Sequence, residues 1–171
     1  MDANPEQAFD RLSNNLNEMI GLYRSLLETI RQEADLLIKA DIEKLNQINK
    51  EKENLLFKIR ALDLAREKYA KDLAKAHRLD LPVPRLLELA RQIGGVSGDQ
   101  LRNYHATLDL LLNRVAKLNR QNEDYTKSAL ETLSGALSEI KGTLAGKPTY
   151  GQKGKMTVGP EKAGNFISKE A

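Results

Sequence analysis

Apolar side chains recur along this chain at alternating steps of three and four residues. The first stretch of this pattern has one polar position, at Glu33, and comprises Phe9, Leu12, Leu16, Met19, Tyr23, Leu26, Ile30 and Leu37. Such spacing places the side chains on one face of an α-helix and forms the seam of a coiled coil or an antiparallel helical hairpin. The pattern therefore predicts a long helix over about residues 6–40, with Pro5 in its first turn, where a backbone N–H is not needed.

A second seam follows Asp41, whose carboxylate can cap the free N–H groups of a new helix. Its members are Leu45, Ile48, Leu55, Ile59, Leu62, Tyr69, Leu73 and Ala76. Lys52 and Arg66 occupy intervening positions, and we expect their aliphatic stems to lie along the apolar face while their charges reach water. Residues 38–42 fit either a turn or a kink. A turn is favoured because two helices of similar length, about 6–40 and 42–77, can then cover one another.

Two prolines, Pro82 and Pro84, end this second helix. A short amphipathic segment, Arg85–Ile93, precedes a break at Gly94–Gly98. A third seam follows: Leu101, Tyr104, Leu108, Leu111, Val115, Leu118, Asn122, Tyr125 and Ala129, then Leu133, Leu137, Ile140 and Leu144, with Leu130 alongside. It predicts a helix over about residues 99–144, capped by Ser97 or Asp99. Asn119 and Asn122 are interpreted as polar seam positions that fix the register of the helices.

The predicted fold class is all-α. Residues 1–144 are expected to form an elongated antiparallel bundle of three long helices with coiled-coil character, plus the short helix. Residues 145–171 contain five Gly, two Pro and five Lys with few aliphatic side chains, so we expect a separate, flexible tail. The tail has five basic and two acidic residues, which accounts for the net charge of +3 of the whole chain. The helical body is therefore neutral.

Composition argues against several classes of function. The chain has no Cys, which excludes disulfides, thiolate nucleophiles and Cys-based metal sites. His77 and His105 lack partners at metal-ligand spacing, and no Gly-rich loop matches a phosphate-binding pattern. We therefore expect no enzyme activity, no cofactor and no metal. A neutral body with a weakly basic tail does not indicate nucleic-acid binding. No apolar run approaches the roughly 20 residues of a spanning helix, and no signal peptide is recognised, so we expect a cytoplasmic protein without membrane insertion.

The predicted helices differ in length. At 1.5 Å per residue the first two would each span roughly 50 Å and the third roughly 70 Å. If they pack side by side, ten or more residues at the C-terminal end of the third helix have no cover from this chain. This end still carries an apolar stripe of Leu130, Leu133, Leu137, Ile140 and Leu144. An exposed stripe of this kind marks a protein-binding surface, unless it packs inside a homodimer or against the bundle.

Four sequence blocks in order resemble the FlgN-type flagellar type III export chaperones over nearly the whole length. They are Ala40–Leu45 (ADIEKL), Glu51–Leu56 (EKENLL), Leu118–Asn122 (LNRQN) and Thr149–Gly154 (TYGQKG). The resemblance implies a cytoplasmic chaperone that holds a terminal segment of hook–filament junction proteins against the C-terminal part of its last helix. It also implies that the tail docks on the cytoplasmic domain of the membrane export gate, with Tyr150 as the anchor and the nearby Gly151 and Gly154 leaving its ring accessible and the backbone adaptable.

Other interpretations stay open at this point. The same seams would serve a coiled-coil scaffold that oligomerises and has no client. Tyr150 would then be an ordinary linker tyrosine. A helical protein that binds membranes or nucleic acid through its tail is a third interpretation, which a charge of +3 spread over 27 residues supports poorly.

Overall fold

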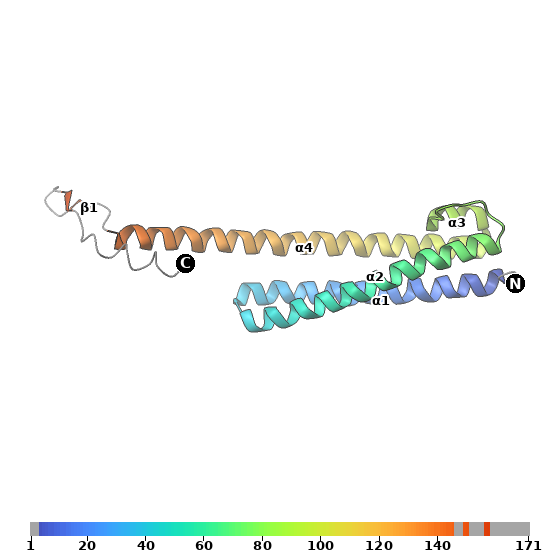
Figure 1. The fold of residues 1–171 in the computed structure, drawn as a ribbon, viewed down its shortest axis with the longest axis horizontal. Helices are drawn as coiled ribbons and strands as arrows, with labels where there is room; N and C mark the ends of the chain where they lie inside the picture. Colours follow the sequence, from blue (N-terminus) through green and yellow to red (C-terminus); the bar gives the residue numbers. More distant parts are fainter. Residues whose placement is uncertain (1–3, 146–148, 151–155, 158–171) are drawn as a thin grey trace. The chain divides into compact units, whose positions relative to one another are not determined.

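A computed structural model describes residues 4–145, 149–150 and 156–157. It contains the helices α1 (Pro5–Lys39), α2 (Ile42–Ala76), α3 (Leu86–Ile93) and α4 (Gly95–Leu144), followed by the two-residue strands β1 (Thr149–Tyr150) and β2 (Met156–Thr157) (Figure 1). The strands pair antiparallel, with Thr149 opposite Thr157. The chain divides into two compact units, residues 1–123 and 124–171, so α4 contributes to both. The predicted all-α fold is confirmed.

The first two helices form an antiparallel hairpin and lie side by side (Figure 1). Helix α1 ends where the Asp41 N–H donates to the Leu36 carbonyl and the Ala40 N–H to the Leu37 carbonyl, both at 3.2 Å. Ala40 has a φ of 53°, so the pattern is a Schellman motif with a left-handed residue after the helix. The Asp41 carboxylate then accepts a 3.2 Å hydrogen bond from the Lys44 N–H and starts α2. The predicted turn is therefore confirmed.

The start of α4 differs from the prediction. The helix begins at Gly95, so Ser97 and Asp99 lie inside its first turns and the predicted cap at either residue is wrong. Gly94 and Gly95 have φ values of 65° and 55°, which favour glycine. These two residues are sufficient to separate α3 from α4, and the rest of the glycine-rich run continues as helix.

The core of the first unit consists of aliphatic side chains from all four helices. Its most completely buried members are Leu12, Leu16, Ala70, Leu73, Leu89, Ala90 and Leu101. The short α3 is held there by its apolar face, because it buries Leu86, Leu89 and Ala90 in the same cluster. A side chain at Gly98 would collide with the Ala90 carbonyl, so this glycine permits α4 to approach α3 closely. Each fully buried leucine stabilises the fold by roughly 1.5–3 kcal/mol.

A second cluster extends this core along the hairpin. Leu26, Ile30 and Ile59 are its buried members, and Leu55, Val115 and Leu118 pack against them. These residues come from α1, α2 and α4, and all of them were assigned to seams from their spacing. The three seams therefore face one another in the first unit.

Candidate protein-binding surface

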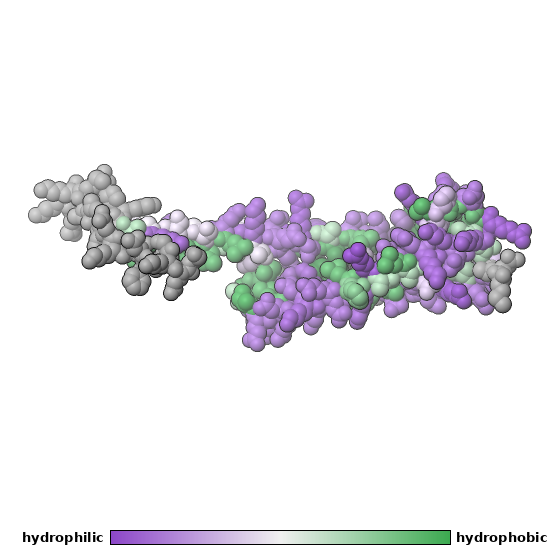
Figure 2. Space-filling view, viewed as in Figure 1, coloured by the Kyte–Doolittle hydropathy of each residue, from purple (hydrophilic) through white to green (hydrophobic). Residues whose placement is uncertain are grey.

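Large apolar side chains are exposed on the part of α4 that belongs to the second unit. We call the five residues of the predicted stripe the ridge: Leu130, Leu133, Leu137, Ile140 and Leu144. Their exposed fractions are 62%, 57%, 49%, 54% and 45%. Every residue from 124 to 141 is exposed, and apolar surface is visible on a portion of this stretch of α4 in Figure 2. Scattered exposed leucines are ordinary, but five at regular spacing form a contiguous apolar surface, an arrangement typical of interaction sites.

The spacing of the ridge is typical of helix surfaces that pack against another helix. Its residues follow steps of three, four, three and four, so they occupy one face over four helical turns, about 21 Å at 1.5 Å per residue. In coiled coils this spacing forms holes of four residues that receive side chains of the facing helix. The ridge is therefore shaped for an amphipathic helix that carries its own apolar stripe.

The side chains beside the ridge are small, and a hydroxyl among them forms its hydrogen bond within α4. Ala129, Ser134 and Ala136 are neighbouring exposed residues, and the space beside Gly135 is open. The Thr132 hydroxyl donates to the Ser128 carbonyl at 2.9 Å, one turn back in the same helix. Small neighbours allow a second backbone to approach closely, because the distance between packed helices depends on the side chains at the contact.

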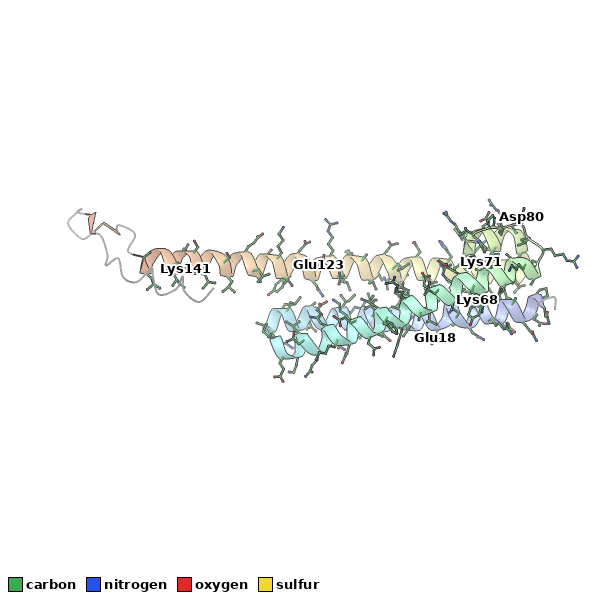
Figure 3. The ribbon with its side chains drawn as sticks, in the orientation of Figure 1. Glu18, Lys68, Lys71, Asp80, Glu123 and Lys141 are labelled. Atoms are coloured by element: carbon green, nitrogen blue, oxygen red, sulfur yellow. The ribbon has the colours of Figure 1, made fainter. Side chains whose placement is uncertain are left out.

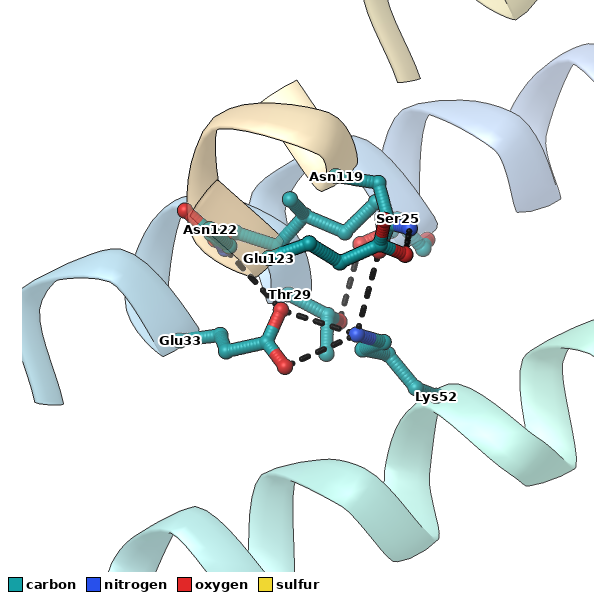
Figure 4. Close-up of polar contacts among 8 residues, drawn as sticks. Ser25, Thr29, Glu33, Lys52, Asn119, Asn122 and Glu123 are labelled. Carbon is teal, nitrogen blue, oxygen red and sulfur yellow. Dashed lines mark hydrogen bonds and ion pairs between the residues drawn. The ribbon is translucent and has the colours of Figure 1, made fainter. Parts of the chain in front are cut away.

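Polar positions of the three seams meet inside the first unit (Figure 4). We call Glu33, Lys52, Asn119 and Asn122 the polar layer. The Lys52 ammonium lies 2.8 Å from both carboxylate oxygens of Glu33 and donates to the Asn119 side-chain carbonyl at 3.3 Å. The Asn122 side-chain amide donates to the Ile30 carbonyl and to the Glu33 carboxylate, both at 2.9 Å. One carboxylate thus joins α1 to α2 and to α4.

The contribution of the polar layer to stability depends on how deeply its charged groups are buried. The side chains of Glu33 and Lys52 are only 11% and 17% exposed, and Asn122 is buried. The prediction that the Lys52 charge reaches water is wrong, because Glu33 of the facing helix binds the ammonium instead. Burying the two charges costs free energy that their attraction and the asparagine hydrogen bonds must offset. The spacing located each polar position separately, but it did not reveal that the positions lie at one level.

The tail residues predicted to dock on the export gate are only partly described. Tyr150 lies in β1, where its backbone is paired opposite Met156. The structure does not describe its side chain, and Gly151 and Gly154 lie outside the described residues. Their role in docking stays a prediction.

The two histidines belong to different parts of the fold. His77 follows the last residue of α2, whereas His105 lines a cleft of about 580 Å³ between α2, α4 and the segment before α3. Among the described residues, no three His, Cys, Asp or Glu side chains gather as a metal ion would require. Nor does any helix in the described ranges have both the length and the apolar character to cross a membrane.

Comparison with known proteins gives one match. Residues 1–157 match the family described as FlgN protein, a span that includes all four helices and both strands. No curated protein and no solved structure matches the chain. The family match covers the first compact unit and residues 124–157 of the second, and it agrees with the resemblance of the four sequence blocks. The chain therefore belongs to the FlgN family of flagellar export chaperones.

Proposed function

We propose that this protein is a cytoplasmic chaperone whose ridge binds hook–filament junction proteins and which delivers them to the export gate. The observation that carries the proposal is the ridge itself, five large apolar side chains about half exposed on one helix face. Chaperones of the FlgN family bind flagellar hook-associated proteins. A terminal amphipathic helix of such a client could lay its apolar face on the ridge, and both stripes would leave water.

This binding would be reversible. Covering the exposed half of a leucine or isoleucine yields about 1 kcal/mol, so the ridge contributes about 5 kcal/mol and the client a similar amount. The loss of translational and conformational freedom removes much of this gain. The client would be shielded from premature polymerisation while it is bound. It could still be released at the membrane, which a transport chaperone requires.

A paired substitution tests the ridge. Leu133→Asp with Leu137→Asp places two carboxylates in the middle of the proposed interface. We expect co-purification with a co-expressed hook-associated protein to be lost. Helicity measured by circular dichroism should persist, because both residues are exposed.

The matched control is Val96→Asp with Leu110→Asp. These residues lie on the same helix, are 76% and 51% exposed, and are outside the ridge. The control should retain the client. Unchanged client binding by the ridge variant would show that the client uses another surface.

The second step of the proposal assigns gate docking to Tyr150, with Gly151 and Gly154 as its neighbours. This assignment is supported by the block Thr149–Gly154, which contains Tyr150 and resembles the family. We expect Tyr150→Ala to retain the client and to lose binding to the cytoplasmic domain of the gate. Tyr125→Ala, at a half-exposed tyrosine of α4, is the control and should retain gate binding. If gate binding survives Tyr150→Ala, this residue serves only as a linker.

The exposed ridge would also suit a scaffold that oligomerises without a client. Sedimentation of the purified chain separates the two functions. A chaperone should sediment as a small species whose ridge amides exchange freely with solvent. A stable, large oligomer with residues 130–144 protected from exchange would favour the scaffold.

A further inference from the structure

Helix α2 carries a second exposed apolar strip, which is separate from the seam that packs on α1. Phe57 and Leu64 are 75% and 65% exposed, and the exposed Ala61 lies between them in sequence. Figure 2 shows apolar surface over the middle of α2. The chain has only three Phe, and Phe9 packs against the core. Of the two phenylalanines that the structure describes, Phe57 is therefore the one left largely in water, although burial is favourable for an aromatic side chain.

The spacing of the strip matches a helix-binding site. Phe57, Arg60, Ala61 and Leu64 occupy positions i, i+3, i+4 and i+7, and all four are exposed. Four residues in this arrangement form the hole that receives one side chain of a facing helix. The methyl group of Ala61 leaves space at this hole. The larger Phe57 and Leu64 provide its apolar walls.

The charge around the strip is positive. Residues 57–76 contain six basic and three acidic side chains, and Arg60, Lys68 and Lys71 are exposed. None of these three forms an ion pair within the described part of the chain, whereas Arg66 is bonded to Asp63 at 2.8 Å. Lys68 and Lys71 lie close together on α2 in Figure 3. The unpaired cations attract a partner of opposite charge and disfavour a basic one.

We propose that this outer face of α2, defined by Phe57, Arg60, Ala61, Leu64, Lys68 and Lys71, docks an acidic amphipathic helix of another protein. An apolar side chain of the partner enters the hole at Ala61, and flanking carboxylates meet the three cations. An anionic membrane would meet the same charges. The apolar strip, however, comprises only two large side chains, less than the broad apolar face with which an interfacial helix is buried in lipid.

The outer face of α2 shares no residue with the ridge of α4. Docking here therefore does not depend on the proposed client site, and each can be tested with the other intact. A chaperone with both surfaces could hold a client and contact an acidic partner at the same time.

The test uses a synthetic helix with leucines at heptad spacing flanked by glutamates, and an analogue in which glutamine replaces every glutamate. Fluorescence anisotropy with the full chain at low salt should show at least about tenfold tighter binding of the acidic peptide, a preference that falls as salt screens the charges. Lys68→Glu with Lys71→Glu should abolish the preference. Phe57→Ser with Leu64→Ser should weaken binding of both peptides.

Lys117→Glu with Arg120→Glu is the matched control, because it reverses two exposed charges on α4. This control and the variant Leu133→Asp with Leu137→Asp should bind the acidic peptide as the unmodified chain does. Circular dichroism verifies that each variant is folded.

Three results would overturn the proposal. The first is equal binding of the two peptides, or a preference that survives Lys68→Glu with Lys71→Glu. The second is binding to phosphatidylglycerol vesicles that depends on these lysines, with no peptide preference, which would assign the face to a membrane. The third is self-association of the purified chain that Phe57→Ser with Leu64→Ser abolishes, which would assign it to a second copy.

Discussion

Lys52 of α2 places its ammonium 2.8 Å from both carboxylate oxygens of Glu33 in α1. Asn122 of α4, the third helix that contributes to the polar layer, donates to the same carboxylate. A slip of one helix by a single turn would leave a buried charge without its partner, whereas the surrounding leucines would tolerate such a slip. The polar layer therefore selects the register of the three helices.

Lys52→Met should destabilise the first unit by about 3 kcal/mol, because it leaves the Glu33 carboxylate buried without its counter-charge. Urea denaturation followed by circular dichroism measures the free energy of unfolding. Lys50→Met, at an exposed position of the same helix, should change this free energy by less than about 0.5 kcal/mol. Equal effects of the two substitutions would show that the ion pair does not contribute to stability.

Replacing the buried polar groups together should have the opposite effect. Glu33→Leu, Lys52→Leu and Asn122→Leu combined remove both the desolvation cost and the pairing, so stability should stay equal or rise by about 1–4 kcal/mol. We expect the register to loosen, which broadened amide resonances in NMR spectra would reveal. A combined variant with sharp, uniquely assigned resonances would contradict the role of the layer in selecting the register.

Ala40→Gly should stabilise the hairpin by about 0.5–1 kcal/mol. Ala40 has a φ of 53°, where a Cβ is unfavourable and glycine is not. Thermal or urea unfolding measures the gain. Ala116→Gly, at an exposed position inside α4, should instead destabilise by about 1 kcal/mol. A loss of stability at position 40 would show that the turn does not require the left-handed conformation.

We expect Asp41 to make the hairpin sensitive to acid. The hydrogen bond from the Lys44 backbone amide, helped by the Lys44 side chain, lowers the pKa of Asp41 below its usual value of 3.8. A carboxyl whose pKa is lower in the folded state stabilises the fold above its unfolded pKa and loses this effect as the pH falls through its folded pKa. Asp41→Ala should therefore lower the Tm at neutral pH, and the difference should shrink well below pH 3.8.

Asp41→Asn is the matched control for the acid sensitivity. Asparagine caps a helix about as well as aspartate, so this variant should retain a high Tm at neutral pH without the dependence on the carboxyl. A Tm deficit of Asp41→Ala that is the same at neutral and acidic pH would contradict the assignment.

Local signals in the sequence predicted most of the bundle. The three seams, the first turn at Pro5 and the cap at Asp41 depend on neighbours within one or two turns, and the structure confirms each of them. The glycine-rich run misled the prediction, because two of its residues suffice for the break. Gly98 instead serves a contact with Ala90, which lies in another helix. A contact between two helices of this kind cannot be predicted from the spacing of residues along the chain.

The candidate surfaces were likewise predicted where the signal was local and missed where it depended on tertiary structure. The ridge was predicted from its periodicity and from the length of the last helix, and its five side chains are exposed. The pairing of Glu33 with Lys52 was missed because the axial alignment of two helices is a tertiary property. The outer face of α2 was missed because Phe57 and Leu64 lie off the seam and attract attention only once their exposure is known.

Amide hydrogen exchange of the full chain, with and without a bound hook-associated protein, tests the role of the ridge most directly. We predict that amides in residues 126–144 exchange freely in the isolated protein and slow at least about tenfold in the complex, while the hairpin of α1 and α2 stays unchanged. Two results would contradict the account. One is protection of residues 130–144 in the isolated chain equal to that around Leu12 and Leu16; the other is a complex in which protection appears only outside the ridge.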